Sequence, residues 1–252
     1  MMAKKDLTPR EKKARGFLLN AKDKRQLKHI VLKDQLEAQY GKTLNKMQIR
    51  YLEKGIRYQL IYDIETSDFN PYQNFMICFV AYRRDIVTGK VTKHVEHISK
   101  ADISKAVKGN NFDFDYVLLQ KLSELLKSCD QACGHFSTKF DNGFFRSRCL
   151  LTNQTDLIPD YQDMMFGDTW AMMKKTMKAP RNTLNNLILQ ATGKSDKTHV
   201  DLEYWYKVRF KDSPDWSKAM FYIVDHCKKD VAMTYKALQK IEHFNNVQGG
   251  FT

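Results

Sequence analysis

The acidic pair Asp63 and Glu65 has the spacing of two metal ligands. The pair lies in the apolar run Tyr58–Thr66, and a β-strand places residues two apart on the same face. Two carboxylates side by side on a buried strand are costly without a compensating charge. Oxygen ligands of this kind are those that Mg²⁺ or Mn²⁺ prefers. The alternative is an edge strand with one solvated face, since an Asp-x-Glu pattern alone is common by chance.

Asp141 is a second candidate ligand. It follows the stretch Gly134–Phe140, where a strand is expected to end in a polar turn just before a helix. Open α/β sheets bind ligands along the carboxyl edge of their strands, and a residue in this position can reach that edge. Asp141 could also be a plain helix cap, and capping does not exclude metal binding.

His226 and Asp230 form the third group. Residues four apart lie on one face of a helix, so the imidazole and the carboxylate can address one point. An apolar stripe beside them places the pair at the margin of the face that packs on the core; its members are Trp216, Ile223, Cys227, Val231 and Leu238. The alternative is a surface His–Asp pair that contributes roughly a few tenths of a kcal/mol.

These side chains need a sheet and helices to bring them together. Short apolar runs predict strands at Tyr58–Thr66, Asn74–Arg83, Val91–Ile98, Gln131–Phe136 and Met164–Asp168. Apolar stripes at helical spacing predict helices at Phe114–Lys127, Asn142–Leu151, Asn182–Thr192 and about 215–244, with Gly193 as a C-cap. Three strands followed by alternating helices and strands indicate an α/β fold with a mixed sheet flanked by helices.

The N-terminal segment differs from the rest of the chain. Residues 1–57 are dense in Lys and Arg, and Thr8–Glu11 has the pattern of a helix capping box. We therefore expect a basic, mostly helical arm, which either binds phosphates or packs on the domain as a solvated face. Residues 58–244 form the main domain in this division, and residues 245–252 form a flexible tail.

Composition narrows the class of protein. The 252 residues carry a formal net charge of +13, which suggests a polyanionic partner such as nucleic acid. No apolar run reaches the roughly 18–20 residues of a membrane span, and the charged N-terminus lacks a signal core. Five cysteines without a Cys-x-x-Cys pair indicate a reducing, cytoplasmic location. The spacing Cys129-x3-Cys133 is poor for structural zinc.

Together the three groups resemble the Exo I, Exo II and Exo III motifs of the DEDD 3′→5′ exonucleases, in the same order. The stretches Ile61–Thr66 and Asp225–Val231 are similar to the proofreading exonuclease domain of family B DNA polymerases and to stand-alone relatives. Two further segments, Asp168–Trp170 and Leu184–Gly193, resemble the region between the second and third motifs. The resemblance covers about residues 58–244 and excludes the basic arm.

This resemblance implies an RNase H-like fold and a two-metal mechanism. It makes Asp63, Glu65, Asp141 and Asp230 ligands of two Mg²⁺ or Mn²⁺ ions, and His226 the residue that orients or deprotonates the attacking water. The implied substrate is the 3′ end of nucleic acid, with single-stranded DNA favoured and RNA as the alternative. The arm is then a candidate site for a replication or repair protein. Phe69 and Tyr72 are expected either to contact terminal bases or to belong to the core.

Two positions depart from the family pattern. Relatives carry a Tyr four residues before the last Asp or a His five before it, whereas here His226 stands four before Asp230. Relatives often have Asn after the Gly-His pair, where this chain has Phe136. The first departure leaves the base open, and the second leaves a substrate contact open. A nucleic-acid-binding accessory module with a degenerate nuclease site is a further alternative, but it predicts that one of the four acids is missing.

Overall fold

The computed structural model describes residues 21–109, 113–160, 162–194 and 200–243. The expected capping box at Thr8–Glu11 and the expected tail at 245–252 lie outside the described residues. Contacts within the chain divide it into two compact units, Met1–Gly55 and Ile56–Thr252. All of the candidate metal ligands belong to the second unit.

The first unit is helical where the structure describes it. Helix α2 covers Ala21–Tyr40 and helix α3 covers Lys46–Leu52. The Asn45 side chain accepts hydrogen bonds from backbone N–H groups in the first turn of α3, and the Gln48 side chain accepts the N–H of Asn45 in return. This reciprocal capping satisfies N–H groups that have no partner inside the helix. The helical character expected for the N-terminal extension is present in residues 21–52, where the structure describes α2 and α3.

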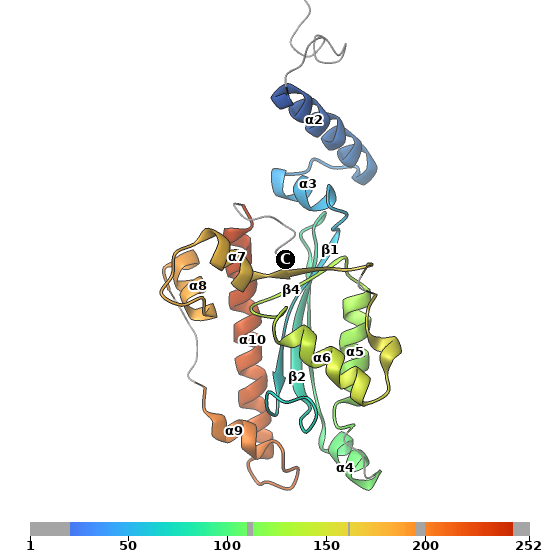
Figure 1. The fold of residues 1–252 in the computed structure, drawn as a ribbon, viewed down its shortest axis with the longest axis vertical. Helices are drawn as coiled ribbons and strands as arrows, with labels where there is room; N and C mark the ends of the chain where they lie inside the picture. The colour runs from blue at the N-terminus through green and yellow to red at the C-terminus, as the bar shows by residue number, and fades with distance from the viewer. Residues whose placement is uncertain (1–20, 110–112, 161, 195–199, 244–252) are drawn as a thin grey trace, which may run out of the picture. The chain divides into compact units, whose positions relative to one another are not determined.

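The second unit is built on a five-stranded mixed sheet in the order β3-β2-β1-β4-β5 (Figure 1). Strand β2 is antiparallel to β1 and β3, whereas β4 is parallel to β1 and β5. The strands are β1 (Tyr58–Thr66), β2 (Met76–Asp85), β3 (Val91–His97), β4 (Gln131–Gly134) and β5 (Met165–Asp168). The expected α/β fold with a mixed sheet is confirmed, and β1 is its central strand.

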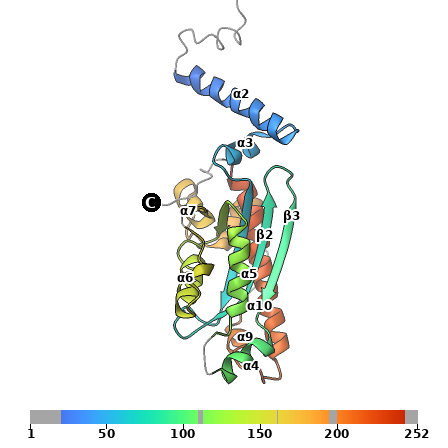
Figure 2. The ribbon, with the colours of Figure 1, turned by 90° about the vertical axis from the view of Figure 1, so that its right-hand side faces the viewer.

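Helices cover both faces of this sheet (Figures 1 and 2). The Tyr62 hydroxyl donates a hydrogen bond to Asn142 of α6, while the next residue, Asp63, contacts Cys227 of α10 on the opposite face. Helix α5 packs on β2 and α6, and α10 packs on both β1 and β2. The helices of this unit are α4 (Lys100–Lys108), α5 (Tyr116–Lys127), α6 (Asp141–Leu151), α7 (Thr169–Thr176), α8 (Leu184–Thr192), α9 (Leu202–Lys207) and α10 (Trp216–Ile241), with a 3₁₀ turn at Thr155–Leu157.

The C-terminal half of β1 extends beyond its parallel neighbour. Strand β2 pairs with β1 from Tyr58 to Thr66, but β4 pairs with β1 only from Gln59 to Ile61. Among the described strands, none covers the β4 side of β1 beyond Ile61. The backbone groups on this side need other partners, and the N-terminus of α6 supplies one of them.

Several local features differ from the sequence-based expectation, including α7, α9 and the 3₁₀ turn, for which no range was predicted. Helix α4 was not expected, because it is short and buries only Ile103 and Ala106; a capping box of Ser99 and Asp102 begins it. The strand expected to reach Phe136 ends at Gly134 instead. Phe136 has a φ of 66°, a left-handed conformation that ends the strand.

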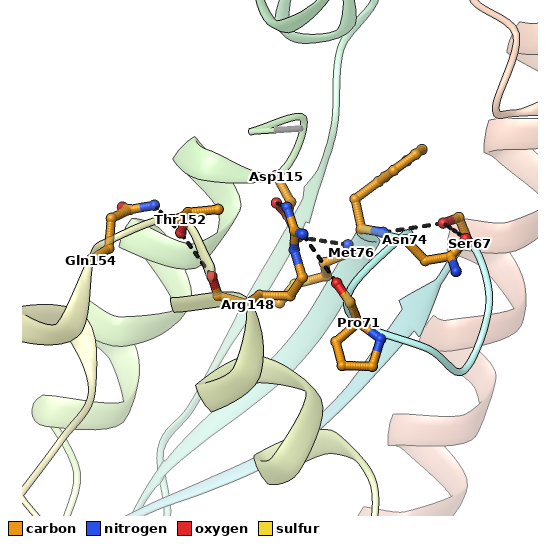
Figure 3. A network of polar contacts seen from close by, with 9 residues as sticks. Ser67, Pro71, Asn74, Met76, Asp115, Arg148, Thr152 and Gln154 are labelled. Carbon is orange, nitrogen blue, oxygen red and sulfur yellow. Dashed lines mark hydrogen bonds and ion pairs between the residues drawn. The ribbon is translucent and has the colours of Figure 1, made fainter. Parts of the chain in front are cut away.

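A buried ion pair fixes the loop between β1 and β2 (Figure 3). Two nitrogen atoms of Arg148 in α6 donate to the Asp115 carboxylate at 3.0 and 2.8 Å, and both side chains are buried. A third nitrogen of Arg148 donates to the carbonyl of Pro71 at 3.1 Å, and Asp115 accepts the N–H of Met76 at 2.8 Å. At the base of the loop, the Ser67 N–H donates to the Phe75 carbonyl oxygen, and the Phe75 N–H donates to the Ser67 hydroxyl oxygen. The loop is thus held from its middle and from its end.

We predict that Arg148→Met lowers the free energy of unfolding by about 3–5 kcal/mol, because the substitution leaves the Asp115 carboxylate buried without its partner. Urea unfolding monitored by circular dichroism measures the change. Lys121→Met is the matched control: Lys121 pairs with Glu96 at the surface, at 2.6 Å, and its loss costs at most about 1 kcal/mol. Equal, small effects of the two substitutions would contradict the structural role of the buried pair.

Candidate metal centre and adjoining cleft

Asp63 and Glu65 lie where the sequence pattern expects them. Both side chains leave β1 on the face covered by α10, whereas Ile64 is buried on the opposite face. Cys227 of α10 lies beside them, with its Sγ 3.5 Å from Oδ2 of Asp63. One ligand atom each of Asp63, Glu65 and Cys227 lies within 4.8 Å of the other two, so the three residues could hold a metal ion.

Asp141 reaches β1 from the first turn of α6. Its Oδ1 accepts the backbone N–H of Ile64 at 3.1 Å, on the side of β1 that β4 leaves uncovered. Asp141 therefore bonds to the central strand, and Phe140 rather than Asp141 is the N-cap residue of α6. The hydrogen bond brings a third carboxylate to the strand that carries Asp63 and Glu65.

Asp230 and His226 approach from the opposite side, on α10. Their side chains lie on one face of the helix, with 3.7 Å between His226 Nε2 and Asp230 Oδ2. His226 is buried, and its ring and that of Trp205 in α9 contact each other edge to face at a centroid distance of 5.7 Å. The expected apolar stripe of α10 is buried beside them, at Trp216, Ile223, Cys227, Val231 and Leu238.

The charges of three other carboxylates act on Asp63. Burial raises the pKa of Asp63 well above its usual value, and the charges of Asp141, Glu65 and Asp230 raise it further. Burial also raises the pKa of Asp141 to about 7, against the opposing effect of its hydrogen bond from Ile64. We call Asp63, Glu65, Asp141 and Asp230 the carboxylate cluster. Such a cluster favours protons or a bound cation.

The turn between β4 and α6 is fixed by side chains that stand outside the cluster. Asp168, at the end of β5, accepts hydrogen bonds from the backbone N–H groups of Phe136, Thr138 and Trp170 and from the Thr138 hydroxyl. These four bonds give Asp168 a structural role. They also hold Phe136 in its left-handed conformation, at a position where Asn is favoured in such backbone.

Gly134 and His135 complete this support. A Cβ atom on Gly134 would lie 2.6 Å from the Cβ of Ser137 and 2.8 Å from the carbonyl oxygen of Tyr62, so only glycine lets the turn fold back onto β1. The two ring nitrogens of His135 lie 3.0 Å from the Thr169 hydroxyl and 3.2 Å from the carbonyl oxygen of Asn182. His135 therefore ties the turn to the segment before α8.

A cleft of about 470 Å³ adjoins the carboxylate cluster. Glu65 and His226 line it on the side of the cluster, and Arg209 and Asp68 are its other charged residues. Its aromatic lining consists of Phe69, Phe140, Trp205 and Tyr206. Phe69 is 82% exposed and contacts Phe140 edge to face, so it belongs to the cleft rather than to the core. Tyr72 is also exposed but does not line the cleft.

Sequence patterns alone did not identify several parts of this site. Cys227 belongs to the apolar stripe of α10, and nothing in its spacing predicts a contact with Asp63 in another element. Helix α9 is only six residues long and carries no buried apolar side chain, so its hydrophobic pattern is too weak to predict a wall of the cleft. The spacing of Trp205 and Arg209 likewise predicts no partner.

No protein-family model and no curated protein sequence matches the chain. Among solved structures, the chain is similar to the family B DNA polymerase from the hyperthermophilic archaeon Pyrobaculum calidifontis, with a TM-score of 0.53 and 13% sequence identity. The match covers 73% of this chain and 24% of the polymerase chain, so this protein corresponds to about a quarter of that chain's length. At this identity the likeness supports the fold alone, a mixed sheet flanked by helices as in the RNase H-like fold.

Within the part of the chain that the structure describes, no helix is long and apolar enough to cross a membrane.

We predict that the metal-free protein loses stability as the pH rises from about 5 to about 8. An ordinary Asp in the unfolded chain has a pKa near ~3.9, whereas the folded pKa of Asp141 is about 7. Between these values the folded protein holds more protons than the unfolded chain, so its free energy of unfolding falls with pH. Between pH 5 and pH 8 the decrease from Asp141 is about 3 kcal/mol, because pH 5 lies about two units below the folded pKa.

Asp141→Asn should remove much of this decrease and make the metal-free protein more stable than wild type at pH 8. Urea unfolding in a chelating buffer across the pH range measures both effects. Asp225→Asn is the control, because Asp225 is on α10 but pairs with Lys229 and is 43% exposed. A wild-type stability that stays flat or rises between pH 5 and 8 would rule out the strained cluster.

Proposed function

We propose that the protein is a metal-dependent 3′→5′ exonuclease that hydrolyses phosphodiester bonds from the 3′ end of nucleic acid. The observation that carries the proposal is the convergence of the carboxylate cluster. Its members come from β1, α6 and α10, which are far apart in the sequence, and their charges act on one another around Asp63. The direction of hydrolysis is supported by the resemblance of the three sequence motifs to those of DEDD exonucleases.

The donor set fits divalent metal ions that prefer oxygen ligands. Asp63, Glu65, Asp141 and Asp230 supply only carboxylate oxygens, and the raised pKa values of Asp63 and Asp141 indicate an uncompensated negative charge. These four residues would hold two Mg²⁺ or Mn²⁺ ions. When bound, such ions lower the pKa of water and neutralise charge on the phosphoryl oxygens.

His226 is the proposed proton acceptor. It lines the cleft beside Glu65, and its Nε2 lies 3.7 Å from Asp230. A neutral imidazole in this position can take a proton from the water that attacks phosphorus. The contact with Trp205 restricts the rotation of the ring and keeps it directed at the cleft. His226 can therefore act as the proton acceptor, although it stands at the spacing where relatives have tyrosine.

The cleft is suited to the terminal part of a single strand. Its volume lies in the range of small-ligand sites, and a nucleotide can occupy it. Two aromatic pairs in the lining, Phe69 with Phe140 and Trp205 with Tyr206 of α9, offer ring faces and edges to bases. Stacking of this kind needs unpaired bases, so we favour single-stranded DNA and treat single-stranded RNA as the alternative. The net charge of +13 supports binding of either polyanion.

The proposal predicts release of mononucleotides from the 3′ end of linear single strands in the presence of Mg²⁺ or Mn²⁺ and no release with a chelator. A product ladder from 5′-labelled DNA and RNA oligonucleotides of one sequence measures polarity and substrate preference together. Circular single-stranded DNA is the control for endonuclease activity. Cleavage of the circle at a rate comparable to that of the linear strand would contradict an exonuclease.

Two variants separate the proposed roles in the same assay. Asp63→Asn should lower the rate by roughly 10³-fold, because several kcal/mol of transition-state stabilisation are lost. His226→Ala should lower the single-turnover rate by about 10²–10⁴-fold at saturating metal, and His226→Tyr should recover part of it. Asp225→Asn should retain the wild-type rate. A rate of His226→Ala within a few fold of wild type would make His226 a structural residue.

A further inference from the structure

Arg209 is a charged side chain of the cleft that the proposed reaction does not use. Among the described residues that line the cleft it is the only Lys or Arg, and the nearby charged groups are Glu65, Asp68 and His226. A nucleic acid strand that enters the cleft brings phosphate anions toward acidic side chains. The single cation in the described lining therefore favours the phosphate positions that lie close to it.

The backbone beside Arg209 is held in place. Val208 is fully buried, and its carbonyl oxygen accepts a hydrogen bond from Nε1 of Trp216 at 3.0 Å. Trp216 is itself buried at the start of α10. The Arg209 side chain thus leaves a fixed point on the segment after α9 and extends to the wall of the cleft.

The guanidinium group of Arg209 has binding capacity left over. Its Nη2 donates to the carbonyl oxygen of Ser67 and lies 3.5 Å from Oδ2 of Asp68. This second distance is long for a charge-assisted bond, which is usually about 2.7–2.9 Å, and Asp68 is largely exposed. The Nε atom is buried and has no hydrogen-bond partner among the described residues. The buried Nε cannot itself reach a bound strand, but the Arg209 side chain is 33% exposed, so the rest of the guanidinium can present its charge to an anion in the cleft.

We propose that Arg209 forms a binding site for a backbone phosphate of the substrate strand. The inference rests on the proposed nuclease function and deepens it, because it assigns the phosphodiester anion as the ligand of this wall. The planar guanidinium matches two phosphate oxygens, which a point charge does not. The phosphate replaces Asp68 as the anionic partner, while the bond to Ser67 keeps the β1–β2 loop against the cleft.

Single-charge substitutions in the DNA test this site directly. A series of fluorescent single-stranded DNA oligonucleotides, each with one uncharged methylphosphonate linkage at a different position from the 3′ end, is bound in Ca²⁺ so that cleavage is suppressed. In wild type, one linkage should weaken binding by roughly tenfold or more. In Arg209→Gln the methylphosphonate at that position should no longer weaken binding. The slope of log affinity against log[salt] should become smaller in magnitude by about 0.7.

Two further variants make the result specific. Lys211→Ala is the matched control, since Lys211 is two residues away, pairs with Asp212 at 2.7 Å and does not line the cleft. It should keep the wild-type linkage profile. Arg209→Lys should keep the salt slope but lose part of the affinity, because lysine lacks the planar fork. Glutamine can still donate to the Ser67 carbonyl, and an unchanged thermal midpoint of Arg209→Gln verifies its fold.

The outcomes separate this site from the proposed function. A wild-type protein that degrades DNA while Arg209→Gln keeps the same linkage profile overturns the phosphate site alone. Loss of the position-specific effect in Lys211→Ala as well as in Arg209→Gln also overturns it, because the effect would then reflect general charge. A wild-type protein that neither binds nor degrades nucleic acid contradicts the nuclease proposal and the phosphate site with it.

Discussion

Repulsion among four carboxylates at the end of one strand is the constraint on which the rest of the site depends. Asp63 lies on the central strand of the sheet, where burial raises its pKa and the charges of Asp141, Glu65 and Asp230 raise it further. A fold gains nothing in stability from such an arrangement, since burying like charges is costly without protons or cations to neutralise them. The structure keeps the arrangement because separate elements hold each carboxylate in place. Strained electrostatics of this kind is typical of functional sites.

Several elements around β1 hold the carboxylates of the cluster in position. The short β4 leaves part of β1 uncovered, and Asp141 bonds to the exposed backbone at Ile64. Asp168 fixes the turn that leads into α6 without joining the cluster. Arg148, which is also in α6, donates a hydrogen bond to the Pro71 carbonyl oxygen in the β1–β2 loop. A network of ordinary hydrogen bonds and one buried ion pair thereby positions both the carboxylates and the cleft beside them.

Much of the fold could be predicted from the sequence, because strand and helix periodicity are local. Alternation around Asp63 and the four-residue spacing of His226 and Asp230 fix which side chains share a face. What could not be predicted depends on contacts between distant segments. The end of β4 at Gly134 follows from the packing of Ser137 and Tyr62 against it, and the neighbourhood of Cys227 follows from the register of α10 on β1. Helix α9 is too short to show a hydrophobic pattern in the sequence. The contribution of Trp205 to the cleft therefore could not be predicted and follows only from the structure.

The most direct test of the account is the number of Mn²⁺ ions that the carboxylate cluster binds. A titration followed by electron paramagnetic resonance counts free and bound Mn²⁺ without any nucleic acid or turnover. We expect two bound ions per wild-type chain, loss or strong weakening of both in Asp63→Asn, and unchanged binding in Asp225→Asn. Equal Mn²⁺ binding by wild type and Asp63→Asn would contradict it.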